Sequence, residues 1–139
     1  MNHTIIHFEI PAKNLEKLKK FYEDLFAWKF NKFPSGSEMA NQYEYWTIET
    51  VPVDESMQPV GPGSNGGMYP RQKPEDKPLN FISVESADEY IAKAKELGGK
   101  ILSPKMEIPY IGWWASIEDP DGNAFGILEP MMPKPPKSP

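Results

Sequence analysis

Few side chains in this sequence could do chemistry beyond ordinary hydrogen bonding. The chain has two histidines and no cysteine, which excludes disulfides, thiolate catalysis and cysteine-bound zinc. His7 stands in the apolar run TIIHFEI, and Glu9 follows two residues later. Strand residues two apart point to one side of a sheet, so Glu9 can assist His7. We expect no functional role for His3, which stands next to the start of the sequence.

Other catalytic and binding patterns are missing. Two histidines leave little for a catalytic triad, and no nucleophile–base arrangement is recognisable. The stretch GPGSNGG lacks the lysine and the Ser/Thr of a phosphate-binding loop, which predicts a plain loop. The acids of DPDGN at Asp119–Asn123 superficially resemble a metal loop, but the later bidentate glutamate of a calcium loop is missing. This segment is therefore predicted to be a tight turn.

Composition restricts the class of protein. The chain has 139 residues, 39% of them hydrophobic, and a formal net charge of −5. Its lysines and arginines are scattered, so no surface for nucleic acid or an anionic membrane is indicated. No stretch fits a signal peptide or a membrane span. We therefore expect a soluble, cytoplasmic protein of about one domain.

The first half is predicted to contain four strands and one helix. Asn14 can cap a helix whose apolar residues follow the 3.6-residue period: Leu15, Leu18, Phe21, Tyr22 and Leu25. A β-branched and aromatic strand, Thr4–Ile10, precedes this helix and should end at Pro11. The later strands are predicted at Trp28–Phe33, Gln42–Val53 and Gly66–Pro70.

The second half repeats this order after a charged, proline-bearing linker at Arg71–Pro78. Ser86 and Glu89 form a capping box that opens a helix, and Gly98-Gly99 ends it. Strands are predicted at Leu79–Glu85, Lys100–Leu102, Gly112–Ile117 and Ala124–Glu129. The order predicts an α+β fold with an internal repeat: a βαβββ module over 1–75, a second over 76–131, and a disordered tail over 132–139.

Several segments together resemble the vicinal oxygen chelate superfamily, the glyoxalase/bleomycin resistance protein/dioxygenase group. The second half carries AKAKELGGKIL followed by IEDPDGNAFGILEP, and the first carries HFEIP, KKFYEDLFAW and a later glycine pair. The resemblance spans about residues 4 to 131. It implies two βαβββ modules that form one curved mixed sheet around a cleft. It also implies pairing of two chains into a homodimer.

The resemblance also implies a divalent metal site, built from the first and last strands of each module. Carried over one position at a time, it assigns His7 and Glu129 as metal ligands. Asn80 and Tyr69 then stand where a second His and a second Glu would be expected. An Asn oxygen is a weak donor, and a Tyr ligand must first lose its proton. The metal site is thus predicted to be incomplete, with Zn, Ni, Mn, Fe, Co or no ion bound.

Aromatic side chains are numerous for this length, and several should face the cleft. Neighbours on a strand point to opposite faces, so of Trp113 and Trp114 one should pack a helix and the other should face the cleft. The full set is Tyr43, Tyr45, Trp46, Tyr110, Trp113 and Trp114. The predicted cleft-lining residues are Tyr45, Trp46, Tyr69, Asn80 and Trp113.

Three functions fit these residues, and the sequence leaves open whether the protein is an enzyme. The first is a binder of a small, apolar or planar molecule with an incomplete metal site, because such a site needs only a shaped apolar surface and a few polar groups. The alternative is a divalent-metal-dependent lyase, isomerase or ring-cleaving dioxygenase. The third is an interaction module whose cleft is vestigial. One fold can host all three.

Overall fold

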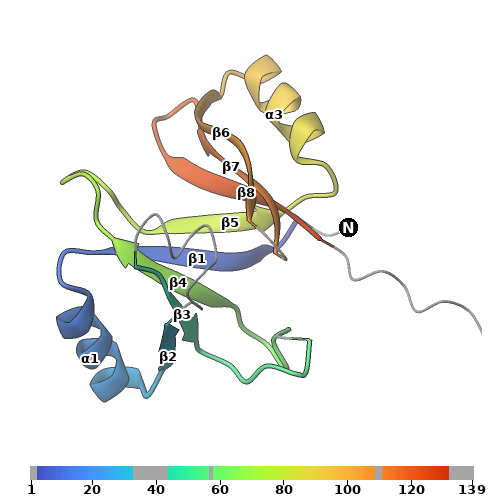
Figure 1. Cartoon of the computed structure of the whole chain (residues 1–139). Helices are drawn as coiled ribbons and strands as arrows, with labels where there is room; N and C mark the ends of the chain where they lie inside the picture. The colour runs from blue at the N-terminus through green and yellow to red at the C-terminus, as the bar shows by residue number, and fades with distance from the viewer. Residues whose placement is uncertain (1–2, 33–43, 57, 109–110, 132–139) are drawn as a thin grey trace, which may run out of the picture. The chain divides into compact units, whose positions relative to one another are not determined.

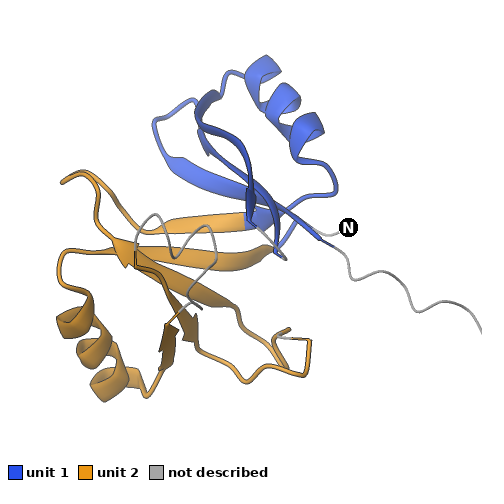
Figure 2. Ribbon diagram, viewed as in Figure 1, with its two compact units in different colours: residues 1–4, 82–139 blue, residues 5–81 orange. Residues whose placement is uncertain are grey.

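The computed structural model of the chain describes residues 3–32, 44–56, 58–108 and 111–131. Along these residues the order strand–helix–strand–strand–strand occurs twice (Figure 1), and the predicted α+β class with βαβββ modules is confirmed. Two compact units divide the chain (Figure 2): unit 2 is residues 5–81, and unit 1 is residues 1–4 with 82–139. Strand β5 (Leu79–Ser83) leads from unit 2 into unit 1. Neither described helix is long and apolar enough to cross a bilayer.

Unit 2 contains a mixed sheet with the strand order β2-β3-β4-β1. Its strands are β1 (Ile5–Ala12), β2 (Lys29–Lys32), β3 (Trp46–Glu49) and β4 (Asn65–Pro70). β1 and β4 run parallel, which places Glu9 opposite Gly67. β3 runs antiparallel to both β2 and β4. This pairing joins segments that are far apart in the sequence.

Helix α1 (Leu15–Phe26) covers one face of this sheet. Asn14 caps it as predicted, because its side chain accepts a hydrogen bond from the Lys17 backbone N–H at 3.0 Å. The helix residues Leu15, Leu18 and Tyr22 pack against a buried core of Ala12, Phe30, Ile48 and Met68. Phe21 and Leu25 follow the same period, but their side chains are 55% and 56% exposed.

In unit 2, the bounds of β1 and β3 differ most from the prediction. β1 continues through Pro11 to Ala12, because pairing with β4 extends over both residues. β3 extends from Trp46 to Glu49 rather than from Gln42 to Val53. The backbone N–H groups of Thr50 and Val51 donate instead to the side-chain oxygen of Asn65, at 2.8 and 3.0 Å. Residues 42 and 43 of the predicted strand lie outside the described residues.

Unit 1 contains three consecutive antiparallel strands beside helix α3 (Ala87–Glu96). The strands are β6 (Lys100–Ile108), β7 (Gly112–Glu118) and β8 (Ala124–Pro130). Ser86 caps α3 as predicted, accepting from the Glu89 backbone N–H at 3.2 Å. The core contains Val84, Ala87, Ala115, Ile117 and Ile127. β6 is much longer than predicted because it pairs along β7, with shifts of register on both sides of Ser103.

The DPDGN segment forms the tight turn that the sequence predicts between β7 and β8. The Asp119 carboxylate accepts hydrogen bonds from the backbone N–H groups of Asn123 and Asp121, both at 2.9 Å, and from the Asn123 side chain at 3.1 Å. The backbone donor of Asn123, assisted by the others, lowers the pKa of Asp119 below its ordinary value. The charged carboxylate therefore holds the turn closed.

Replacing Asp119 with Ala should lower the melting temperature at neutral pH by a few degrees. A carboxyl whose pKa is lower in the folded state stabilises that state above the unfolded pKa of about 3.9, and this contribution disappears as the pH falls through the folded pKa. The difference from the unsubstituted protein should therefore shrink below about pH 4. Asp121→Ala removes the same charge from the same turn and is the control. An equal loss for Asp119→Ala at pH 7 and pH 3 would contradict this account.

Candidate functional site

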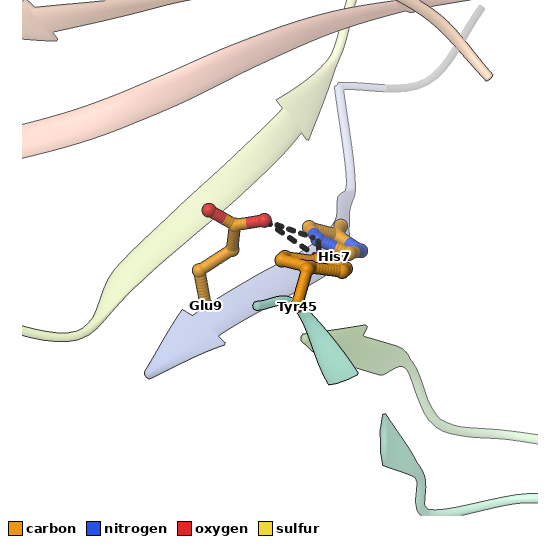
Figure 3. Close-up of polar contacts among 3 residues, drawn as sticks. All are labelled: His7, Glu9 and Tyr45. Atoms are coloured by element: carbon orange, nitrogen blue, oxygen red, sulfur yellow. Dashed lines mark hydrogen bonds and ion pairs between the residues drawn. The ribbon is translucent and has the colours of Figure 1, made fainter. Parts of the chain in front are cut away.

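Three polar side chains meet on the face of the unit 2 sheet that α1 does not cover. His7 and Glu9 come from β1, and Tyr45 comes from the residue just before β3 (Figure 3). The Tyr45 hydroxyl donates to Glu9 Oε2 at 2.7 Å. His7 Nε2 lies 3.3 Å from the same oxygen and 3.4 Å from the Tyr45 hydroxyl. These side chains form one connected network.

Strand alternation separates this network from the apolar core of unit 2. Phe8 and Ile10, the neighbours of His7 and Glu9, pack against the core beneath α1. Trp46 lies on that same side, whereas its neighbour Tyr45 reaches the opposite side and contacts Glu9. The period of two in a strand thus sends apolar residues to the helix and polar residues to the other face.

The glycine pair at the start of β4 provides the space for this arrangement. A Cβ atom on Gly67 would lie 1.7 Å from the Tyr45 hydroxyl oxygen, so only glycine admits that hydroxyl. A Cβ on Gly66 would lie 2.3 Å from the Phe8 carbonyl oxygen. Gly67 stands opposite Glu9 in the β1–β4 register. The missing side chain therefore lets Tyr45 lie across β4 and reach a carboxylate on β1.

Aromatic rings surround the two polar side chains of β1. The ring of Phe81 contacts that of His7 edge to face, with centroids 5.3 Å apart. Tyr45 and Phe81 are 4% and 3% exposed, whereas the side chains of His7 and Glu9 are 27% and 18% exposed. Water can therefore reach part of the imidazole and of the carboxylate, while the rings beside them weaken screening by solvent.

The hydrogen-bond partners of His7 determine which of its two ring nitrogens carries a proton. A carboxylate only accepts, and Tyr45 has given its one proton to Glu9. Nε2 of His7, which faces both oxygens, must therefore carry a proton. Glu9 then holds the imidazole in one orientation, in the way that a carboxylate orients a histidine in many active sites.

The structure places the other predicted cleft residues in different surroundings. Trp46 packs on the α1 side, with Lys19 Nζ 5.0 Å from the centre of its ring. Trp113 packs against the core of unit 1 that α3 covers. Tyr69 follows Gly67 by two residues on β4 and so shares its face, half-buried. Tyr43 and Tyr110 lie outside the described residues.

Asn80 is exposed at the start of β5. Its neighbour Phe81 is the residue that contacts the His7 ring. By strand alternation Asn80 points to the opposite face. The structure therefore brings Phe81, and not Asn80, to His7. A shift of one residue in the expected alignment produces this difference.

Glu129 lies at the N-terminus of helix α3. Its Oε1 accepts a hydrogen bond from the Ala87 backbone N–H at 2.8 Å, next to the cap formed by Ser86. A carboxylate in this position satisfies a free backbone donor and interacts favourably with the helix dipole. Glu129 belongs to unit 1 and His7 to unit 2. Within its own unit, Glu129 supports a helix.

The residues of the network do not form a complete site for a transition metal. Among the described residues, no group of three or more His, Cys, Asp or Glu side chains is placed to hold an ion. His7 and Glu9 supply two donors, and the third polar group is a phenol that already donates its proton to Glu9. About three protein ligands are needed for such an ion, so the network by itself supplies too few.

The sequence predicted that two of the network residues, His7 and Glu9, lie on the same face of one strand. It found Tyr45 only as an aromatic residue of the cleft, and it missed Phe81 and Gly67. The glycine pair was the available signal, because adjacent glycines in a strand mark a close approach from both sides.

Comparison with known proteins shows which family the chain is similar to. Residues 4–127 match the Glyoxalase/Bleomycin resistance protein/Dioxygenase superfamily. A "Glyoxylase-like domain-containing protein" of Didymella fabae is 28% identical over 91% of this chain and 94% of its own length. "Putative glyoxylase CFP32" of Mycobacterium tuberculosis is 31% identical over 87% of this chain and 43% of its own length. The chain thus spans less than half of that mycobacterial relative.

Solved structures share the fold at low sequence identity. A hypothetical protein of Bacillus halodurans has a TM-score of 0.68 and 13% identity over 97% of this chain and 99% of its own. A methylmalonyl-CoA epimerase of Mycobacterium tuberculosis has a TM-score of 0.65 and 10% identity over 92% of this chain and 88% of its own. At these identities the likeness concerns the fold alone.

Gly67→Ala should destabilise the protein by about 1–3 kcal/mol, because the new methyl group overpacks the site where the Tyr45 hydroxyl lies. Urea unfolding of a double-mutant cycle measures the coupling. In a Tyr45→Ala background, which vacates that space, Gly67→Ala should cost less than about 1 kcal/mol. An equal cost in both backgrounds would show that Gly67 does not position Tyr45.

Glu129→Ala should lower the free energy of unfolding by about 0.5–2 kcal/mol, as the loss of a helix cap does. Glu129→Gln keeps an acceptor for the Ala87 N–H and should cost less. Chemical denaturation of both variants provides the comparison. If Glu129→Gln instead removed a stoichiometrically bound metal and left stability unchanged, Glu129 would be a ligand rather than a helix cap.

Proposed function

The chain belongs to the Glyoxalase/Bleomycin resistance protein/Dioxygenase superfamily, and on this premise we propose that it binds a small, planar or apolar molecule without a resident metal. The proposed binding surface is the face of the unit 2 sheet that carries His7, Glu9 and Tyr45. The single observation that carries the proposal is this hydrogen-bonded network, which combines solvent-reachable polar atoms with buried aromatic rings.

The composition of this face suits a small ligand. A binding site needs mostly apolar walls and a few placed polar groups that fix the orientation of the ligand. His7 and Glu9 supply hydrogen-bonding groups held by their neighbours, and the buried rings of Tyr45 and Phe81 pack beside them. Groups that are already oriented lose less entropy when a ligand binds.

The donor set supports binding without a resident metal. The described residues bring one imidazole and one carboxylate together in the network, fewer than the about three protein ligands that such an ion needs. Glu129, the second predicted ligand, is engaged at the N-terminus of α3. We therefore expect binding that relies on hydrogen bonds and apolar contact rather than on Lewis-acid chemistry.

A thermal-shift screen of planar aromatic compounds tests this function on the full chain purified without chelators. A ligand at about 100 times its Kd stabilises the folded state by roughly 2.7 kcal/mol, which corresponds to a shift on the order of 5–10 °C. The shift should be unchanged by EDTA. Absence of any hit from a broad library, or hits that EDTA abolishes, would contradict the proposal.

The alternative is a divalent-metal-dependent lyase, isomerase or ring-cleaving dioxygenase. One observation favours it: His7 Nε2 and Glu9 Oε2 converge to 3.3 Å, as two ligands of one ion would. Elemental analysis in the same preparations, with Mn, Ni, Fe, Co or Zn added, separates the two functions. Stoichiometric metal would favour the enzyme, and sub-stoichiometric metal would favour the binder. The homodimer and the cytoplasmic location expected from the sequence stay predictions.

A further inference from the structure

We propose that the His7–Glu9–Tyr45 network selects a small organic cation, an amidinium, guanidinium or ammonium compound that presents N–H donors to Glu9 and His7. This inference rests on the proposed function and specifies the chemical class of its ligand. It comes from the polar atoms that the network leaves open and from the charge that the site carries.

The open atoms of the network are both acceptors. Tyr45 and His7 contact the same carboxylate oxygen of Glu9, Oε2, and Oε1 has no partner among the described residues. With the proton of His7 on Nε2, its Nδ1 carries the free lone pair. No side-chain polar atom of the described residues is both buried and without a partner. Oε1 and Nδ1 are therefore open to solvent.

Glu9 has no lysine or arginine as a counter-ion among the described residues. In that part of the chain, no lysine or arginine lies within ion-pair distance of Glu9, and the imidazole of His7 is its one ion-pair neighbour. Lysines that could balance a carboxylate form their ion pairs elsewhere in unit 2: Lys19 with Glu23, Lys20 with Asp24 and Lys32 with Glu44.

The surroundings strengthen the attraction of Glu9 for a cation. The Glu9 side chain is 18% exposed, and the buried rings of Tyr45 and Phe81 displace water beside the network. A carboxylate in such surroundings is screened less than one on an open surface. A positively charged N–H group can donate a hydrogen bond to Oε1 and is attracted by the carboxylate. An anion is repelled by the carboxylate and leaves Oε1 without a donor.

Three benzene derivatives of nearly the same shape provide the test: benzamidine (a cation), benzamide (neutral) and benzoate (an anion). Calorimetric titration of the full chain at neutral pH should show benzamidine binding at least about tenfold more tightly than benzamide, with benzoate weakest. Charge-assisted hydrogen bonds are typically strong enough for this ratio. The comparison uses the unsubstituted protein and so does not depend on any variant folding.

Glu9→Gln locates the site by removing the charge while keeping the size of the side chain. It should weaken benzamidine binding about tenfold or more and change benzamide binding by less than about threefold. Glu16→Gln, in the first turn of α1, changes the net charge equally on the helix-covered side and should have no effect. Circular dichroism checks that both variants are folded.

The outcomes separate this inference from the proposed function. Equal affinity for the three probes would overturn cation selectivity and leave small-molecule binding supported. Benzamidine binding that Glu9→Gln does not change would overturn the assignment of the site to this network. If benzamidine does not bind at millimolar concentration although planar neutral compounds do, the inference fails alone. If no compound binds, both proposals fail.

Discussion

The polar network depends on the absence of one side chain, that of Gly67. The Tyr45 hydroxyl occupies the space that a Cβ on Gly67 would take, and this close approach brings a residue of the β3 segment to a carboxylate on β1. The parallel pairing of β1 with β4 places Gly67 opposite Glu9. Any side chain there would push the tyrosine away, and His7 would lose one of its two polar neighbours. The absence of a side chain at Gly67 thus determines whether Tyr45 can hydrogen-bond to Glu9.

The two faces of the unit 2 sheet differ in composition: one is apolar and packs against α1, and the other is polar. One face packs Phe8, Ile48 and Met68 against α1 and supplies the hydrophobic core. The other face carries His7 and Glu9, whose polar atoms are satisfied by each other and by Tyr45. Polar groups that bond one another can be partly buried at little cost. The core can therefore be apolar throughout while the opposite face stays polar.

A carboxylate can serve quite different purposes in one chain. Glu9 lies among rings and another titratable group, with one oxygen open to solvent. Glu129 instead accepts from the first backbone N–H of α3, and Asp119 holds a turn through three donors. The residue type alone does not distinguish these roles, because each is set by the donors that the fold brings within reach.

The sequence by itself determined the α+β class, the repeated βαβββ order, the family, the caps at Asn14 and Ser86, and the shared face of His7 and Glu9. Local periodicity and capping chemistry carry that information. Only the tertiary structure decided that Tyr45 rather than Trp46 meets Glu9, that Phe81 rather than Asn80 meets His7, and that Glu129 meets a helix end. Alternation fixes which residues share a face, but strand register and packing decide what that face contacts, and a shift of one residue reverses every assignment.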